Sequence, residues 1–381
     1  MHEAYACHHG RPRLVEGRYA AVRVATPPAA DLPRGGKGCE TRRAMDFDLS
    51  DDQVALQSGA RELLDTLASS ARVRAHTETD AGYDAELWSA MADQGWLGIE
   101  VAESQGGVGL GAVEVAVLCE ELGRHAAPAP FVSTVLAIDA FSTAGEDAWV
   151  ERLAAGDALA CVAWDATAPV PYAPSADVAV VIADDGVYAM DIEERPRRQP
   201  AMDLTREVGW LAFDPGRARR LGGADARTRL VDRGATFCAA DLLGSSSRAL
   251  DLAVDYAKDR VQFGRPIGSF QAVKHRCADM LVDVEGMRST VYWAAWCIGA
   301  ADPEASIAAS TAKTWCSDAS KRVMSSALQV HGGVGFTWEH DLHFFMKRAQ
   351  LDQLSFGDAS AHRARLTALL RPRVEAGESV V

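Results

Sequence analysis

The sequence has no apolar run that approaches the roughly 18 residues of a membrane-spanning helix, although 48% of its 381 residues are hydrophobic. Its eight cysteines lack the CxxC spacing of metal sites, and we interpret them as reduced thiols in a cytoplasmic protein. Acidic residues outnumber basic ones, with 53 Asp and Glu against 39 Lys and Arg. The net charge of -14 argues against nonspecific nucleic-acid binding, because such binding requires a basic surface that displaces counterions. We therefore expect a large multidomain protein without a membrane or nucleic-acid partner.

Residues 1–44 lack hydrophobic periodicity and a signal-peptide apolar core, and they are rich in Arg, Pro, Gly and Ala. We expect this extension to be disordered. The Cys-His-His run that begins at Cys7 has no fourth ligand in register, so no metal is expected there. Met45 precedes a capping-box signature in which Gln53 follows Ser50, so we expect a helix to begin there and interpret Met45 as the true start.

A stretch near the carboxyl end has the residue types of a phosphate and base site. An apolar pattern with three- and four-residue spacing precedes it and predicts a buried helix face that ends close to Gly264: Ala249, Leu250, Ala253, Val254, Ala257 and Val261. Gly264 suits a left-handed C-cap, and Pro266 cannot continue the helix. Arg260 and Phe263 are therefore expected to leave the helix on neighbouring faces, offering a guanidinium to phosphate and a ring to a base. Gln271 adds an amide where the next helix, patterned from Phe270 to Ala295, begins.

A second stretch, residues 329–336, follows another helical pattern that is entered through Asp302 as N-cap and Pro303 at the first helical position. Gly332 and Gly333 interrupt this helix. Because glycines lack Cβ atoms, a flat pyrophosphate can approach the backbone closely at this point. Together the two stretches indicate half of a dinucleotide-binding site built on helices.

Both stretches resemble the carboxyl-terminal flavin-binding helices of the acyl-CoA dehydrogenase family, whose patterns are R-x-x-F-G-x-x-I-x-x-F-Q and Q-x-x-G-G-x-G. Residues 87–99, 104–110 and 120–124 resemble the helical first domain of that family, so the likeness spans about residues 46 to 370. The resemblance implies FAD as cofactor, an acyl-CoA substrate and an electron-transferring flavoprotein as acceptor. It also implies an oligomer in which these positions hold the ADP half of an FAD whose ring lies in a neighbouring subunit: Arg260, Phe263, Gln271, Gln329, Gly332 and Gly333.

The resemblance further implies a mainly α fold with a small β domain. We expect an N-terminal helical domain over residues 45–158, a middle β domain over 159–228, and a C-terminal four-helix bundle over 229–375 that binds FAD and oligomerises. The sequence supports the middle domain independently. Residues 178–183, the turn Asp184-Asp185-Gly186, and residues 187–192 predict two strands joined by a tight turn.

The sequence departs from the family pattern at the chemically important positions. The T-E-P-x-x-G-S-D-like loop that holds the flavin ring and thioester has only a poor counterpart at residues 164–169. The usual catalytic Glu falls on Phe356, and the alternative base position falls on Gly234; neither residue can take the α-proton of a thioester. Asp358 is a nearby candidate base, although an N-cap role before the last helix is the more ordinary interpretation.

Three interpretations stay open. In the first, the chain forms a heterotetramer with a homologous subunit, as in the branch of the family that degrades steroid side chains in actinobacteria, and lends its ADP-binding half to the partner's FAD. Residues 337–343 resemble that branch. In the second, the chain is a self-sufficient homo-oligomeric flavoenzyme with an atypical base such as Asp358. In the third, it is a scaffold or binding subunit that has lost flavin and kept the fold.

Overall fold

The computed structural model describes residues 48–165 and 167–378, so the expectations for residues 1–44 and for Met45 fall outside it. Helices occupy the first part of the described chain. They are α1 (Asp51–Leu67), α2 (Ser70–Thr77), α3 (Ala85–Asp93), α4 (Ala112–Arg124), α5 (Phe131–Ala144) and α6 (Asp147–Ala154), with a 3-10 turn η1 (Glu103–Gln105). The predicted capping box opens α1, since the Ser50 hydroxyl accepts from the Gln53 N–H at 3.3 Å and the Gln53 amide oxygen accepts from the Ser50 N–H at 3.0 Å.

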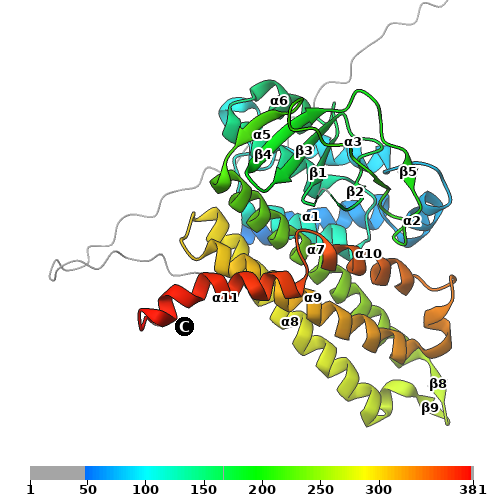
Figure 1. Cartoon of the computed structure of the whole chain (residues 1–381). Helices are drawn as coiled ribbons and strands as arrows, with labels where there is room; N and C mark the ends of the chain where they lie inside the picture. The colour runs from blue at the N-terminus through cyan, green and yellow to red at the C-terminus, as the bar shows by residue number, and fades with distance from the viewer. Residues whose placement is uncertain (1–47, 166, 379–381) are drawn as a thin grey trace, which may run out of the picture. The chain divides into compact units, whose positions relative to one another are not determined.

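The middle of the chain forms two small sheets (Figure 1). A four-stranded sheet has the order β1-β3-β4-β7 and a three-stranded sheet has the order β2-β6-β5. The strands are β1 (Ala160–Ala163), β2 (Val170–Pro171), β3 (Val178–Ala183), β4 (Gly186–Asp191), β5 (Arg198–Gln199), β6 (Val208–Gly209) and β7 (Arg219–Gly222). The predicted hairpin is confirmed, because β3 and β4 pair antiparallel up to Ala183 opposite Gly186.

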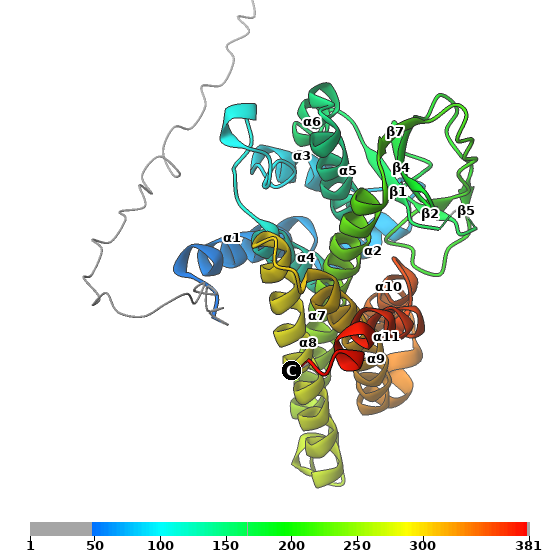
Figure 2. The same ribbon diagram turned by 60° about the vertical axis from the view of Figure 1, so that its left-hand side comes forward.

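Long helices make up the carboxyl-terminal part of the described chain, with α7 at its centre (Figure 2). They are α7 (Ala224–Asp259), α8 (Gln271–Gly299), α9 (Ala305–His331), α10 (Leu342–Leu354) and α11 (Ala359–Glu375). Helix α7 packs against α4, α8, α9 and α10. At the crossing with α4 the backbones touch: a Cβ added to Gly244 would lie 1.8 Å from the carbonyl oxygen of Glu120, and one added to Gly123 would lie 2.2 Å from that of Asp241. Only glycine allows this approach.

The structure agrees with the mainly α architecture and its middle sheet, and it corrects several boundaries. Helix α7 begins at Ala224, two residues after β7 ends at Gly222. It ends at Asp259, so Val261 lies outside the helix and is exposed instead of buried. Helix α9 begins two residues after Pro303, and the Asp302 carboxylate accepts from the Glu304 N–H at 2.8 Å.

Two statements hold for the part of the chain that the structure describes. No helix there is both long and apolar enough to cross a membrane. The six cysteines there are free, and most are buried in the apolar core, as expected for reduced thiols that act as small hydrophobes. Cys7 and Cys39 lie outside the described residues.

Candidate functional site

Arg260 and Phe263 do not leave a helix on neighbouring faces as predicted, because α7 ends before them. Arg260 is the C-cap of α7 and has extended backbone. A short hairpin follows, formed by β8 (Val261–Gln262) and β9 (Arg265–Pro266), and the turn residues Phe263 and Gly264 have φ of +53° and +77°. Two successive positive φ angles are typical of a type I′ hairpin turn. Gly264 thus has the predicted left-handed conformation, but in a hairpin and not in a helix cap.

The Phe263 ring is held in a strained and exposed position. A non-glycine residue at positive φ costs on the order of 1–2 kcal/mol. The ring is 91% exposed, so core packing does not offset that cost. Its one ring contact in the described chain is an edge contact with Phe270, centroid to centroid 6.1 Å, and Arg265 in turn lies 4.2 Å from the Phe270 centroid. Strain at an exposed aromatic turn is typical of a ligand-binding position.

The second stretch is also open to solvent. Helix α9 ends at His331, and Gly332 begins a 3-10 turn, η3 (Gly332–Phe336), with φ of +62°. A Cβ added to Gly332 or Gly333 meets no atom within 4 Å, so these glycines border open space instead of a packed core. Gln329 is exposed on the last turn of α9. This arrangement leaves backbone and an amide free to meet a ligand.

Ring stacking connects the two stretches. Tyr256 lies one turn before Arg260 on α7 and stacks on His331, which immediately precedes Gly332, with centroids 4.8 Å apart and planes at 27°. The His340 ring lies 4.3 Å from that of His331. The hairpin itself lies at the end of α7 and α8 farthest from the β sheets (Figure 1). The stack of Tyr256 on His331 therefore places the last turn of α7 beside the last turn of α9, so the two stretches that carry the predicted positions follow neighbouring helix ends. Their residue types suit the phosphates and base of an ADP group.

The two base positions of the family meet in one place, and a phenyl ring occupies it. Phe356 is buried and stacks on Trp164 with centroids 4.9 Å apart. Its ring covers Gly234 so closely that an added Cβ would lie 2.3 Å from it. The backbone of Phe356 has φ of +56°, and the Nε2–H of His362 donates to its carbonyl oxygen at 2.9 Å, which stabilises this turn. No carboxylate replaces the missing base at either position.

The space around Phe356 is almost filled. The cavity there has about 40 Å³ and is bordered by Phe131, Trp164 and Tyr172. Pockets that hold small organic ligands usually have roughly 300–1,000 Å³. Trp164, in the poor counterpart of the flavin-binding loop, is partly buried, and its ring packs on Phe356 and the core. The residue types of the first two stretches suit the ADP half of FAD, whereas the cavity beside Phe356 is too small for a flavin ring.

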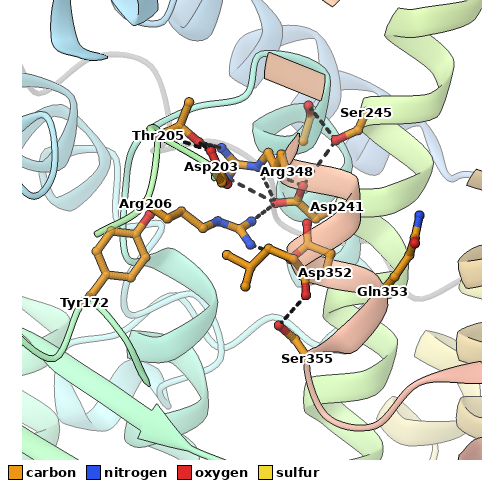
Figure 3. A network of polar contacts seen from close by, with 12 residues as sticks. Tyr172, Asp203, Thr205, Arg206, Asp241, Ser245, Arg348, Asp352, Gln353 and Ser355 are labelled. Atoms are coloured by element: carbon orange, nitrogen blue, oxygen red, sulfur yellow. Dashed lines mark hydrogen bonds and ion pairs between the residues drawn. The ribbon is translucent and has the colours of Figure 1, made fainter. Parts of the chain in front are cut away.

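A buried ionic network, drawn in Figure 3, contributes to the lining of the same cavity. It joins the middle domain to α7 and α10 through Arg206, Asp241, Arg348 and Asp352. The Asp241 carboxylate accepts hydrogen bonds from the Arg206 guanidinium at 2.7 Å and from the Arg348 guanidinium at 3.0 Å. The Asp352 carboxylate accepts one from the other terminal nitrogen of Arg206. All four side chains are at most 10% exposed. Lys313 of α9 donates to the Asp352 carbonyl oxygen at 2.7 Å.

The two carboxylates of this network differ in their environment. Burial raises the pKa of Asp241, but the adjacent guanidinium groups of Arg348 and Arg206 outweigh burial and lower it overall. Burial raises the pKa of Asp352 to about 7, since it contacts Arg206 alone among the arginines and lies close to Asp241. Both groups are enclosed, so neither is available to substrate.

Asp358 caps a helix. Its carboxylate accepts from the Ala361 N–H at 2.8 Å at the start of α11, and this hydrogen bond lowers its pKa. An exposed carboxylate with a lowered pKa and an occupied oxygen is a weak general base. The structure therefore favours the N-cap role over the catalytic one.

Substitution of Asp358 distinguishes these roles. We expect Asp358→Ala to lower the free energy of unfolding by about 1 kcal/mol, because an N-cap is lost, and to leave the turnover of the assembled enzyme unchanged. Asp358→Asn is the matched control, since Asn caps helices well and should retain most of that stability. Denaturant unfolding and steady-state turnover are the measurements. A fall in rate of about two orders of magnitude in both variants would instead identify Asp358 as the base.

The sequence interpretation missed the ionic network. One signal was present: Asp241 interrupts the apolar run of residues 237–243, and a lone acid within such a run has to find a buried partner. Arg348 and Asp352 are one turn apart on α10, which places them on one helix face. The identity of their partners depends on helix packing and was not predictable from spacing.

Comparison with known proteins agrees with this architecture. Residues 50–157 match the family described as "Acyl-CoA dehydrogenase, N-terminal domain", and residues 222–370 match "Acyl-CoA dehydrogenase, C-terminal domain". The chain is 36% identical over 323 residues to the acyl-CoA dehydrogenase IpdE2 of Mycolicibacterium smegmatis, an alignment that covers 84% of this chain and 99% of that protein.

Two solved structures are similar over most of the chain. A variant of the Tcur3481-Tcur3483 steroid ACAD superimposes with a TM-score of 0.79 at 29% identity and covers 85% of this chain and 99% of that one. The ChsE4-ChsE5 complex from Mycobacterium tuberculosis superimposes with a TM-score of 0.77 at 28% identity and covers 86% and 99%. Both are structures of two differently named subunits.

Proposed function

The chain belongs to the acyl-CoA dehydrogenase family, and from this premise we propose that it is one subunit of a hetero-oligomer that lends the ADP-binding half of an FAD site to a homologous partner. The assembly introduces an α,β double bond into an acyl-CoA thioester. FAD is the cofactor, and when bound it supplies the acceptor for the hydride that leaves the β-carbon. The partner contributes the flavin cleft and the general base in this proposal.

One observation carries the proposal: the two halves of the site differ within this chain. Phe356 stacks on Trp164 and fills the position that the family reserves for the base, leaving a cavity of about 40 Å³. At the far end of the helices, Phe263 is 91% exposed, and Gly332 and Gly333 border open space. A chain whose flavin cleft is filled but whose ADP-binding residues are exposed is suited to bind the ADP half of an FAD that lies in another subunit.

Each residue of the open half has a distinct task. The Arg260 guanidinium supplies up to five N–H donors for the pyrophosphate, and the amides of Gln271 and Gln329 supply further hydrogen bonds. Phe263 offers a ring face to the adenine, since its turn holds the ring away from the core. Gly332 and Gly333 allow the phosphates to approach the backbone.

The relatives suggest the substrate class. The two solved neighbours are a steroid ACAD and the ChsE4-ChsE5 complex. Because a solved neighbour is described as a steroid ACAD, we propose a steroid-derived acyl-CoA as the substrate of the present chain. We propose an electron-transferring flavoprotein as the acceptor that reoxidises the flavin.

The test is the visible absorption spectrum and the FAD-to-protein ratio of the chain expressed alone and with a homologous acyl-CoA dehydrogenase subunit from the same genome. We expect a colourless preparation alone, and a yellow complex with about one FAD per pair of unlike subunits, because only one member of each pair has a flavin cleft. Full FAD occupancy of the chain alone would overturn the proposal in favour of a self-sufficient flavoenzyme. No flavin in any combination would favour a scaffold subunit.

A further inference from the structure

A second cavity lies between the amino-terminal helices and the carboxyl-terminal helices. It shares no lining residue with the small cavity beside Phe356, which we call the closed cleft, and none of the six residues predicted to hold the ADP half of FAD lines it. Its volume is about 400 Å³, within the usual range for small-ligand pockets. One wall is apolar and comes from Val73, Leu252 and Phe344; Val73 and Phe344 are themselves buried. Three arginines, Arg61, Arg124 and Arg248, line the rest together with short polar side chains. We refer to it as the arginine cavity.

Almost every charge that lines the arginine cavity already has a partner. Arg61 pairs with the buried Glu121 at 2.5 Å, and Arg124 pairs with Asp251 at 2.5 Å. His125 meets Asp65 at 3.0 Å.

The remaining lining acid is satisfied as well. Asp341 accepts from Arg74 and from the Ser70 hydroxyl. These pairs leave no carboxylate in the cavity lining that lacks a cation or a donor.

Arg248 is the exception. It lies on α7 one turn before Leu252, is half-buried, and makes no hydrogen bond or ion pair with any described residue. The nearby acid on the same helix face, Asp251, is occupied by Arg124. The Ser69 hydroxyl, also in the lining, likewise has no hydrogen-bond partner among the described residues. A partly desolvated guanidinium without a counter-charge is unfavourable, and an oxyanion is the group that its planar fork fits best.

We propose that the arginine cavity binds a small organic anion, with one carboxylate or phosphate group on Arg248 and an apolar body against Leu252 and Phe344. One oxyanion is expected because one cation in the lining lacks a partner. An apolar body is expected because a fully hydrated inorganic ion would leave the wall of Val73, Leu252 and Phe344 without contact. This site is separate from the proposed FAD site and does not depend on it.

Isothermal titration of the full chain, or of its complex with the partner subunit, with octanoate and with 1-octanol tests the proposal. The two probes share an apolar chain and differ in the oxyanion. We expect octanoate to bind at least about tenfold more tightly than 1-octanol, and Arg248→Gln to remove that difference, since a hydrogen bond to a charged group is worth about 1.5–3 kcal/mol. Arg248→Lys keeps the charge but loses the fork and should give an intermediate affinity.

The control is Arg217→Gln, which removes an exposed arginine of the middle domain whose closest acid, Glu193, is 3.9 Å away. It should bind octanoate like the unmodified protein. Titration with octyl phosphate, which carries the same apolar chain, distinguishes the two oxyanions: tighter binding than octanoate would identify a phosphate, and weaker binding would identify a carboxylate. Equal binding of octanoate and 1-octanol, or no binding of octanoate, would overturn the proposal. The unfolding temperature and FAD content, measured on the same samples, separate these outcomes from misfolding or from failure of the FAD proposal.

Discussion

Replacing Arg260 by alanine is expected to weaken FAD retention in the assembled protein by about ten- to a hundredfold, because a charge-assisted hydrogen bond to phosphate contributes about 1.5–3 kcal/mol. Arg260 is exposed beside the hairpin, and its side chain makes no hydrogen bond or ion pair with any residue that the structure describes. The loss should therefore appear as faster release of FAD during dilution or gel filtration. The unfolding temperature of the FAD-free chain should not change.

Lys258→Ala is the matched control for this experiment. Lys258 lies two residues earlier, is similarly exposed, and among the described residues forms an ion pair with Asp255 alone, at 3.3 Å. Removing it takes away the same charge from the same helix end and should leave FAD affinity nearly unchanged. Unaltered FAD content in the Arg260→Ala assembly would remove Arg260 from the cofactor site and would weaken the assignment of the other five positions with it.

The second large effect is a loss of stability when the buried ionic network beside Phe356 is broken. Asp241→Ala is expected to lower the free energy of unfolding by about 3–5 kcal/mol, because it leaves Arg206 with one carboxylate and Arg348 with none in a site closed to water. Denaturant unfolding at neutral pH measures this loss. The expected cost is a large fraction of the 5–15 kcal/mol that stabilises a typical domain.

Asp255→Ala on the same helix provides the comparison. Asp255 is exposed and, within the described part of the chain, pairs with Lys258 alone, so its loss should change the free energy of unfolding by no more than about 0.5 kcal/mol. If Asp241→Ala costs less than about 1 kcal/mol, the network does not hold the middle domain against α7 and α10. The cleft beside Phe356 would then be free to open for a ligand. This would contradict the proposal that the partner subunit contributes the flavin cleft.

Much of the fold was predictable because it depends on local spacing. The β3–β4 hairpin followed from two apolar runs around Asp184-Asp185-Gly186, and the α1 capping box followed from Ser50 and Gln53. The long carboxyl-terminal helices followed from apolar residues three and four positions apart. Boundaries were less reliable. The prediction for α7 placed its end near Gly264, since both a C-cap and a hairpin turn use a glycine at positive φ.

The sequence by itself determined the family, the order of helices and sheet, and the absence of an acid at Phe356 and Gly234, because each of these depends on residue identity at a position along the chain. Only the tertiary structure decided that Phe356 covers Gly234 and stacks on Trp164, and that Asp241 gathers two arginines from distant segments. Only the tertiary structure likewise decided that Arg248 lines the arginine cavity without an ion-pair partner among the described residues. Contacts between residues far apart in the chain depend on how helices and sheet pack against each other, and side-chain packing and charge pairing in three dimensions leave no periodic signal in the chain.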